Sequence, residues 1–523
     1  MNTSLIPESA PFSAAQRAWL NGLIAGWMGL DGGGAAQPAP APVEAEEDYP
    51  WHDPTLALEE RLKLAEGRPH ARRLMAAMGQ LDCGQCGYQC KEYAEAIAQG
   101  AEKDLGRCVP GGRPTAKKLK ELLSAHGTSA TVVQLVAAPQ PEKPSDAELG
   151  YHRDAPLPAR LIASTALTSP DCDRSVQHVA LDLGETGLAY RPGDSLGVWV
   201  RNNPEEVELI LGLLDARGSE PVTLADGTLT TAREALSRYC ELRWPSSSLY
   251  WTLARFARSA RDARTLAGFA DDDAGAHRLG IHEVLNTLTR FPSARPPVSE
   301  FAAALGRLQP RMYSIASSLR VHPREVHLTV ALVSYELFAR NYRGLASNFF
   351  AERLKPGKTL PVYVQRAHAF ALPADDVPVI MVGPGTGIAP FRAFLEERAA
   401  RGAKGRNWLF FGNQRQTGDF LYRCELENWR ASGLLTRLEL AFSRDQERKI
   451  YVQHRMREHA RELWAWLEAG AHFYVCGDAS RMAADVDRAL AGIIAAEGGM
   501  DEPAARHHIA ALAKAGRYQR DVY

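Results

Sequence analysis

The chain has 523 residues, of which 45% are hydrophobic and 24% charged, a composition typical of a globular protein of about three domains. Its formal net charge is −1, so it lacks the overall basic character of most nucleic-acid-binding proteins. Eight cysteines in this length exclude a disulfide-rich scaffold, and their clustering favours metal binding in a reducing compartment. We therefore expect a cytoplasmic protein that binds no nucleic acid.

The first 50 residues are expected to hold one helix and a linker. Ser13 and Gln16 have capping-box spacing ahead of the apolar run 18–30, which predicts a short helix over residues 13–30 within an N-terminal segment 1–31. This run is too short to span a bilayer and lacks the basic start of a signal peptide. Residues 32–50 are rich in Pro, Ala and Gly and are predicted to form a linker.

A small unit over residues 51–136 contains half of the cysteines. Cys83, Cys86 and Cys90 form a C-x2-C-x3-C pattern, and Cys108 follows ahead of VPGG. Four thiolates, three close together and one remote, suit a [4Fe–4S] cluster. Tetrahedral zinc is the alternative, although structural zinc sites usually draw on two C-x-x-C pairs and this segment has one. A helix is predicted over residues 115–127, and residues 137–150 are predicted to be a second linker.

From residue 151 onward the pattern predicts continuous folded structure. Residues 326–333 and 360–365 resemble strands, and residues 203–218 resemble a helix. After about residue 376 strands and helices alternate, which is typical of a parallel α/β sheet. The first strand there leads into a glycine-rich turn and then a helix, an arrangement that lets backbone amides approach a pyrophosphate, and this turn contains Gly383, Gly385, Thr386 and Gly387. Such a turn also occurs in proteins that bind no nucleotide.

Four stretches occur in one order along the chain: RMYSIASS (311–318), GLASNFF (344–350), GPGTGIAPFRAF (383–394) and FYVCGDASRMAADV (473–486). Together they resemble the ferredoxin–NADP reductase superfamily, and most closely the FAD/NADPH half of the sulfite reductase flavoprotein and cytochrome P450 reductase group. The resemblance covers residues 151–523. It implies a multidomain protein with an antiparallel β-barrel FAD domain over 151–372, a helical insertion at about 203–300, and a Rossmann-like NADPH-binding α/β domain over 373–523.

The resemblance also implies a flavin site. Arg311 is a planar, charge-assisted donor suited to the FAD pyrophosphate. In the family, the residue that matches Tyr313 stacks on the isoalloxazine, and the one that matches Ser314 bonds near its N5. In the family, one loop caps the flavin phosphates through its backbone amides. The residues of this chain that match it are Gly344, Leu345, Ala346 and Ser347. The alternative is that Tyr313 and Ile315 are only alternating residues of a strand and bind no flavin.

NADP preference is a separate expectation. A site that selects NADP needs cations for the 2′-phosphate, whereas one that selects NAD usually offers a carboxylate to the ribose. Residues 439–453 leave an apolar strand, and the family's contacts to the 2′-phosphate and adenine are matched here by Ser443, Arg444, Lys449, Tyr451 and Gln453. A solvated charged loop is the alternative.

Hydride transfer is expected at the ends of the last strands. The resemblance places Cys476 beside the nicotinamide, where Ser314 and Asp521 help to align the hydride transfer. Asp478 follows in the same motif and is expected to contact the cofactor. Tyr523 matches the terminal aromatic residue that covers the flavin face. The alternative for Cys476 is a small buried apolar residue with no catalytic role. The alternative for the C-terminus is a disordered tail. Three further cysteines are expected to be structural: Cys172, Cys240 and Cys424.

The cysteine segment resembles a small iron–sulfur domain that begins C-G-x-C-G-Y and ends C-x-P-G-G. That pattern has four residues between its second and third cysteines, and this chain has three. The family's FMN module, a flavodoxin-like domain, has no counterpart in residues 1–150. FAD accepts a hydride and haem groups accept single electrons, so we expect the cluster to replace FMN.

The resemblance therefore implies electron flow from NADPH to FAD to the cluster and then to a partner. The sulfite reductase haemoprotein with its siroheme is the partner implied most directly. One alternative is donation to an assimilatory nitrate reductase or another haem protein. The other is a diaphorase whose FAD reduces its acceptor directly, with residues 1–136 as a zinc-bearing docking module.

Overall fold

The computed structural model describes residues 49–125 and 149–523, apart from 225–226, 272–273, 282, 338–339, 368 and 480. The predicted helix at 13–30 and nearly all of both predicted linkers lie outside these residues. The chain forms two units, 1–49 and 50–523, and every element below belongs to the second. Within the described residues, no helix is long and apolar enough to cross a membrane.

The cysteine-rich segment folds as a small helical unit. Its helices are α2 (Leu58–Leu64), α3 (His70–Ala76), α4 (Cys90–Ala98) and α5 (Gly112–Ala125). Helix α4 begins with a capping box between Gln89 and Glu92, which satisfies amides that have no partner inside the helix. Leu74, Tyr93 and Leu119 from three of these helices are fully buried. The sequence predicted α5 at 115–127, close to its observed bounds.

Six antiparallel strands form the barrel that follows. They are β1 (Leu157–Ala166), β2 (Val176–Asp182), β3 (Ser195–Val198), β6 (Arg311–Ser314), β7 (Glu325–Ala331) and β10 (Thr359–Gln365), in the order β6-β3-β10-β1-β2-β7. A bridge between Ile315 and Leu328 joins the two edge strands and closes the sheet. Alternate residues of β1 are buried, as expected for a strand with one face on a core. After β7 come the hairpin β8 (Ser334–Leu337) and β9 (Arg340–Arg343), then α13 (Leu345–Asn348) and η3 (Phe349–Arg353).

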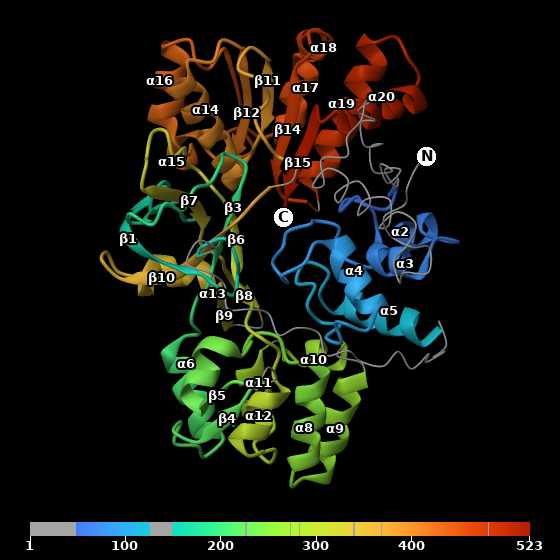
Figure 1. The fold of residues 1–523 in the computed structure, drawn as a ribbon, viewed down its shortest axis with the longest axis vertical. Helices are drawn as coiled ribbons and strands as arrows, with labels where there is room; N and C mark the ends of the chain where they lie inside the picture. The colour runs from blue at the N-terminus through green and yellow to red at the C-terminus, as the bar shows by residue number, and fades with distance from the viewer. Residues whose placement is uncertain are drawn as a thin grey trace, which may run out of the picture. The chain divides into compact units, whose positions relative to one another are not determined.

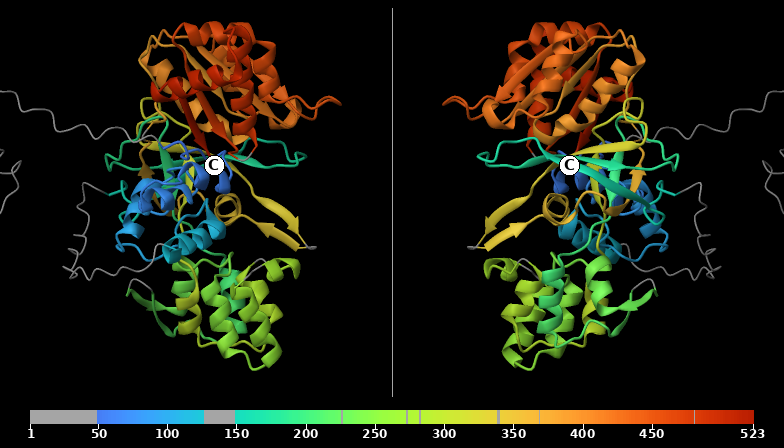
Figure 2. Two further views of the ribbon diagram at one scale, coloured as in Figure 1. Left: turned by 90° about the vertical axis from the view of Figure 1, so that its right-hand side faces the viewer. Right: turned by 90° about the vertical axis from the view of Figure 1, so that its left-hand side faces the viewer.

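A helical insertion, drawn in green in Figure 2, separates β3 from β6 and has its own apolar core. Its elements are α6 (Pro204–Leu213), β4 (Pro221–Thr223), β5 (Leu229–Thr231), α7 (Ala232–Glu234), η2 (Ala235–Tyr239), α8 (Ser247–Phe256), α9 (Ala260–Asp271), α10 (Ala274–Arg278), α11 (Val284–Arg290) and α12 (Val298–Ala304). Helix α6 starts where the Asn203 side chain accepts a bond from Glu205 N. It ends before the predicted residue 218, because Asp215 takes a left-handed backbone with φ 56°.

The C-terminal part, drawn in orange and red in Figure 1, is a five-stranded parallel sheet in the order β13-β12-β11-β14-β15. The strands are β11 (Val379–Val382), β12 (Asn407–Asn413), β13 (Arg437–Phe442), β14 (His472–Gly477) and β15 (Tyr518–Val522). The connecting helices are η4 (Gly385–Ile388), α14 (Ala389–Arg401), α15 (Gln416–Asp419), α16 (Arg423–Ala431), α17 (Val452–Glu458), α18 (Ala460–Glu468), α19 (Met482–Glu497) and α20 (Glu502–Lys514). The strand order reverses between β11 and β14, the position at which doubly wound sheets bind ligands.

Both faces of this sheet are covered by helices. Ile380 and Val382 of β11 pack into the core beneath α17–α20, whereas Met381 packs into the core beneath α14 and α16. Side chains alternate between faces along a strand, so a strand buried on both sides must be apolar throughout. The parallel sheet expected from the sequence is thus confirmed, together with the antiparallel barrel.

Candidate functional site

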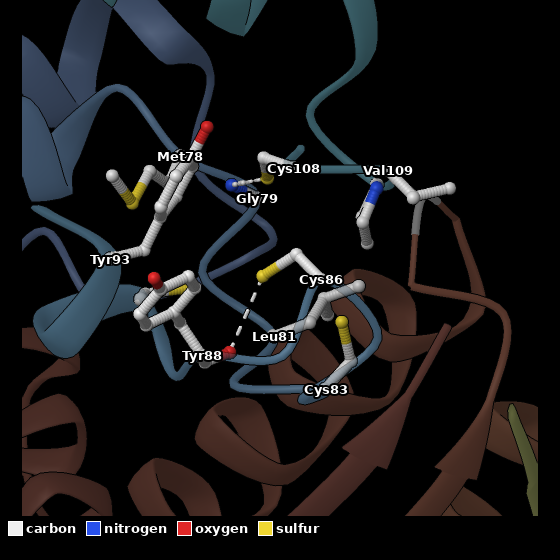
Figure 3. Close-up of a pocket in the computed structure, with 11 residues that line it drawn as sticks. Met78, Gly79, Leu81, Cys83, Cys86, Tyr88, Tyr93, Cys108 and Val109 are labelled. Atoms are coloured by element: carbon white, nitrogen blue, oxygen red, sulfur yellow. Dashed lines mark hydrogen bonds between the residues drawn. The ribbon is translucent and has the colours of Figure 1, made fainter. Parts of the chain in front are cut away.

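The four clustered cysteines line one cavity in the helical unit. Cys83 and Cys86 lie on the loop between α3 and α4, Cys90 is the first residue of α4, and Cys108 lies on the loop before α5. The rest of the wall is mainly apolar or aromatic and includes Met78, Leu81, Tyr88, Tyr93 and Val109 (Figure 3). The four sulfur-bearing residues that the sequence singled out are therefore close in space.

These four sulfurs are buried, and a buried thiolate is unfavourable unless a cation neutralises its charge. Burial raises the pKa of Cys83 to about 12 and also raises the pKa values of Cys86, Cys90 and Cys108. The Gly79 amide donates a 3.4 Å hydrogen bond to the Cys108 sulfur (Figure 3). A metal centre binds deprotonated cysteine and neutralises that charge, so the donor set and its shielded cavity fit an iron–sulfur cluster.

The short spacing before Cys90 is accommodated by the loop. Gly84 and Gly87 take left-handed backbones, with φ 63° and 95°, which tighten the turn around Cys86. The Cys90 amide then donates a 2.8 Å bond to the Asp82 carboxylate, which fixes the start of α4. Three intervening residues are thus enough to bring the third sulfur to the cavity.

The residues expected to hold the flavin lie on β6. Arg311 is half-buried; its guanidinium donates to Gln309 O at 2.6 Å and is 3.4 Å from the Glu241 carboxylate. The Tyr313 ring makes an edge contact with Phe350, with centroids 5.7 Å apart. The neighbouring strand β3 holds β6 in place, since Leu196 pairs with Tyr313.

The loop expected to cap the flavin phosphates lies at the start of α13. A Cβ added at Gly344 would lie 2.7 Å from Val333 Cβ, so a side chain there would clash. Ser347 Oγ accepts a 3.1 Å bond from Val333 N. Leu345 and Ala346 stand in the first helical turn, where amides have no partner within the helix and can face an anion.

Three predicted catalytic residues meet although they come from different strands. Ser314 Oγ donates a 2.6 Å bond to Asp521 Oδ2, and Cys476 Sγ lies 3.7 Å from the same oxygen. Burial raises the pKa of Asp521, and it raises the pKa of Cys476 well above its usual value. The group therefore offers a hydroxyl, a neutral thiol and a carboxyl at the junction of the barrel and the sheet.

The glycine-rich turn packs directly on this group. A Cβ at Gly387 would lie 2.1 Å from Cys476 O, and one at Gly383 would lie 2.5 Å from Gly387 O, so both positions require glycine. Thr386 Oγ1 and the Tyr523 hydroxyl are 2.9 Å apart. Gly385 takes a left-handed φ of 58° with free space around it.

The residues expected to bind the 2′-phosphate and adenine lie around the end of β13. Arg444 and Lys449 are exposed, Tyr451 is 43% exposed, and Ser443 N bonds to Asn413 O at 2.9 Å. Gln453 is buried and donates to Asp485 at 3.1 Å. Asp478 accepts bonds from Arg481 N and Met482 N and so caps the start of α19.

Two residues near these sites had no sequence motif to mark them. Asp173 forms an ion pair with Arg444. Arg153 bonds to the backbone between two of the clustered cysteines, because its guanidinium donates to Gln85 O at 2.6 Å. Each lies in a stretch of ordinary polar composition far from its partner in the chain, so only the fold reveals the contact.

Comparison with known proteins agrees with this geometry. The sulfite reductase [NADPH] flavoprotein alpha-component of Photorhabdus laumondii is 42% identical over 408 residues, which are 78% of this chain and 67% of that protein. This chain belongs to the same family. Proteins of that name from Cronobacter sakazakii and Klebsiella pneumoniae are each 44% identical over 374 residues, which are 71% of this chain and 62% of each relative. The chain thus matches about two thirds of the length of these flavoprotein alpha-components.

Three family models match separate parts of this chain. The FAD binding domain model matches residues 150–349, the oxidoreductase NAD-binding domain model matches residues 381–488, and an Fe-S cluster model matches residues 79–110. The last range contains all four clustered cysteines. The predicted family, fold class and set of cofactors are confirmed, whereas the roles of individual site residues remain predictions.

Proposed function

We propose that this protein is an NADPH-dependent flavoprotein reductase that passes electrons from NADPH through FAD and a [4Fe–4S] cluster to a haem protein. The single observation that best supports this path is a contact between the cysteine loop and the flavin strand. Gln85, which lies between Cys83 and Cys86, donates a buried 2.7 Å bond to Pro310 O. Pro310 directly precedes Arg311 at the start of β6.

The first step is hydride transfer from NADPH to FAD, for which the flavin supplies the two-electron acceptor. Ser314 and Cys476 border the place where the nicotinamide must meet the flavin, and Asp521 fixes both side chains through one carboxylate oxygen. Tyr523 would cover this position and would have to move aside for the nicotinamide; its hydroxyl lies 2.9 Å from Thr386 Oγ1. Arg444 and Lys449 would hold the 2′-phosphate.

The second step is single-electron delivery, for which the cluster supplies the carrier. Cys83, Cys86, Cys90 and Cys108 would hold it, in a cavity whose apolar wall limits the access of water. Val109 is part of this wall and is 38% exposed, so the centre lies close to the surface. A partner can therefore approach the cluster without reaching the flavin.

The partner that we propose is the siroheme-containing haemoprotein of sulfite reductase. The support is the name of the relatives, which are flavoprotein components of an NADPH-dependent sulfite reductase. All eight cysteines of the chain lie in the described residues and are unpaired, which suits a reducing compartment such as the cytoplasm.

The test is metal analysis and reconstitution with anaerobically purified protein. We expect FAD, about four iron atoms per chain, and sulfide formation from sulfite when NADPH and the haemoprotein from the same cell are added. Stoichiometric zinc without iron would contradict the relay. Iron and FAD with electron transfer only to another haem protein would contradict the proposed partner.

A further inference from the structure

We propose that Arg153 is a positioning residue that holds the cysteine loop, residues 83–87, against the flavin strand and so sets the rate of electron transfer from flavin to cluster. The inference rests on the proposed function, because it concerns the path between those two groups. It adds a residue outside every motif in the sequence, and it separates the geometry of the path from the ligation of the cluster.

The guanidinium of Arg153 bridges the cysteine loop and the segment that leads into β6. One nitrogen, Nη1, donates to Gln85 O at 2.6 Å, and the other, Nη2, donates to Gln309 Oε1 at 2.9 Å. Gln309 lies two residues before Arg311, whose guanidinium donates to Gln309 O. One planar fork therefore joins the backbone beside Cys86 to the residues that lead into the flavin strand. A lysine has a single ammonium and cannot reproduce this fork.

The barrel holds Arg153 itself in one orientation. Its guanidinium lies over the Trp199 ring, 5.4 Å from the centroid, and Trp199 Nε1 donates back to Arg153 O at 3.0 Å. Trp199 follows β3 and donates its backbone amide to Pro361 O in β10. The side chain that reaches the cysteine loop is thus anchored on two barrel strands.

Two glycines of the cysteine loop allow the barrel side chains to pack closely against it. A Cβ added at Gly87 would lie 3.0 Å from Arg153 Cδ, and one at Gly84 would lie 2.6 Å from the Gln365 side chain at the end of β10. Both glycines also take left-handed backbones. The loop therefore sits against the barrel at a separation that larger residues would not allow.

The charge of Arg153 has a second consequence. The guanidinium bonds to the carbonyl of Gln85, the residue directly before Cys86, so a positive charge lies beside the cluster's ligand shell. Uptake of an electron makes a cluster more negative, and nearby charge and hydrogen bonds tune its potential. Removal of this charge should make the potential more negative. Arg107 offers a comparison, because its guanidinium lies over the Tyr88 ring and pairs with Glu102, and both of these residues belong to the cysteine-rich segment.

The redox balance is simple. One hydride from NADPH would bring two electrons and one proton to FAD and leave NADP⁺, and the reduced flavin would then give up the electrons one at a time and release the proton to solvent. Each electron would reduce the cluster once and then pass to the haem partner. Arg153 takes part in none of these bond changes; it fixes the separation across which the electron moves.

The experiment uses the full-length, iron-loaded protein with four variants, Arg153→Lys, Arg153→Gln, Gln309→Ala and Arg107→Gln. Three quantities are measured: iron and FAD content, the rate of cluster reduction after mixing with NADPH under anaerobic conditions, and the cluster midpoint potential. Hydrogen exchange of the amides of residues 84–87 reports separately on whether the loop stays docked.

We expect each Arg153 variant and Gln309→Ala to slow cluster reduction by about tenfold or more, because small misplacements of reacting groups have effects of this size. Arg153→Lys and Gln309→Ala should keep the wild-type potential, and Arg153→Gln should shift it to a more negative value. Arg107→Gln should shift the potential and keep the transfer rate. Exchange in the loop should be faster only in the first three variants.

Wild-type transfer rates in Arg153→Lys, Arg153→Gln and Gln309→Ala, with full iron and FAD, would overturn the inference and leave the relay intact. If Arg153→Gln loses iron, Gln309→Ala decides the matter, because it alters the bridge without touching the cysteine loop. Failure of NADPH to reduce the cluster in the wild-type protein would instead contradict the proposed function.

Discussion

Ser314 of the barrel donates a 2.6 Å hydrogen bond to Asp521 of the last strand of the parallel sheet. This bond joins residues 207 positions apart in the chain, and Cys476 lies 3.7 Å from the same carboxylate oxygen. The contact places a hydroxyl from the proposed flavin strand beside two residues at the ends of the nucleotide-binding strands. Flavin and nicotinamide would meet at this junction.

The first prediction concerns the protonation of Asp521. Burial holds its pKa above the usual 3.8, so the carboxylate gains its proton at a higher pH than an exposed aspartate as the solution is acidified. Protonation removes the anionic acceptor of Ser314, and we expect flavin reduction by NADPH to slow on that acidic side. Asp521→Asn should lower the rate by about 10- to 100-fold at neutral pH, the value of a charge-assisted bond of about 1.5–3 kcal/mol.

The same substitution provides its own control for folding. A raised pKa means that ionised Asp521 opposes stability as pH rises from its unfolded value through its folded value. Asp521→Asn should therefore unfold at the same or a higher temperature than the wild type at neutral pH. Stopped-flow flavin reduction across pH is the measurement, and an acidic decline that persists unchanged in Asp521→Asn would refute the assignment.

The second prediction concerns the terminal ring. Tyr523 is 55% exposed, and its hydroxyl is 2.9 Å from Thr386 Oγ1. Tyr523→Ala keeps the backbone bonds to Gly477 and Ala479 but removes the ring, so nicotinamide should reach the flavin more readily. Turnover with NADH should rise relative to NADPH. Tyr523→Phe, which keeps the ring, should show little change, and an unchanged ratio in Tyr523→Ala would mean that the ring does not cover the flavin.

The third prediction concerns nucleotide choice. Arg444→Ala should weaken NADPH binding by about 10- to 100-fold and leave NADH binding nearly unchanged, because a charge-assisted contact of about 1.5–3 kcal/mol exists only with the 2′-phosphate. Asp173 pairs with Arg444 and competes with that phosphate. Asp173→Asn should therefore tighten NADPH binding by up to about fivefold, since exposed pairs are worth at most about 1 kcal/mol. Equal effects on both nucleotides would exclude this site for the 2′-phosphate.

Much of the fold could be predicted because local patterns determine it. Val379–Val382 is apolar throughout, a glycine turn follows, and the strand is buried on both faces as expected. The cysteine cavity was predictable for a similar reason, since three of its ligands fall within eight residues. Gly387 could be assigned to a close approach from its place in the motif, and it packs against Cys476 O.

Contacts between distant segments could not be predicted from local patterns. The meeting of Ser314 with Asp521 was expected only through resemblance to a family, because strand register and barrel closure set it. Arg153 and Asp173 had no motif, since each belongs to a polar stretch whose partner lies in a distant part of the chain and is brought close by the fold. The early end of α6 depends on the left-handed backbone of Asp215, which its sequence does not require.

The fourth prediction concerns two histidines between the barrel and the parallel sheet. Burial lowers the pKa values of His178 and His327 to about 3, and Arg392 contributes to both shifts. These histidines are neutral in the folded protein but bind protons below about pH 6.5 when it unfolds, so acid should destabilise the fold between pH 6.5 and 3. For His327, whose side chain is 6% exposed, the loss at pH 5 is at most about 2 kcal/mol.

His327→Asn should therefore reduce the difference in unfolding free energy between pH 7 and pH 5. Chemical denaturation at both pH values measures this difference. His507 is exposed on α20, and His507→Gln serves as the matched control with no expected effect. If the difference in unfolding free energy between pH 7 and pH 5 is the same in His327→Asn and the wild type, protonation of His327 does not contribute to the acid sensitivity.

The most direct measurement of the relay compares two activities of one variant, Cys86→Ser. A serine hydroxyl is a poor substitute for a soft thiolate ligand, so the cluster should be lost or become labile. The FAD and NADPH sites lie on other elements, so flavin content, reduction by NADPH and transfer to ferricyanide should persist at wild-type levels. Delivery to the haem partner should fall to background. Retention of partner activity by a variant that lacks the cluster would contradict the electron path, and a parallel loss of both activities would show that the cysteines serve only the fold.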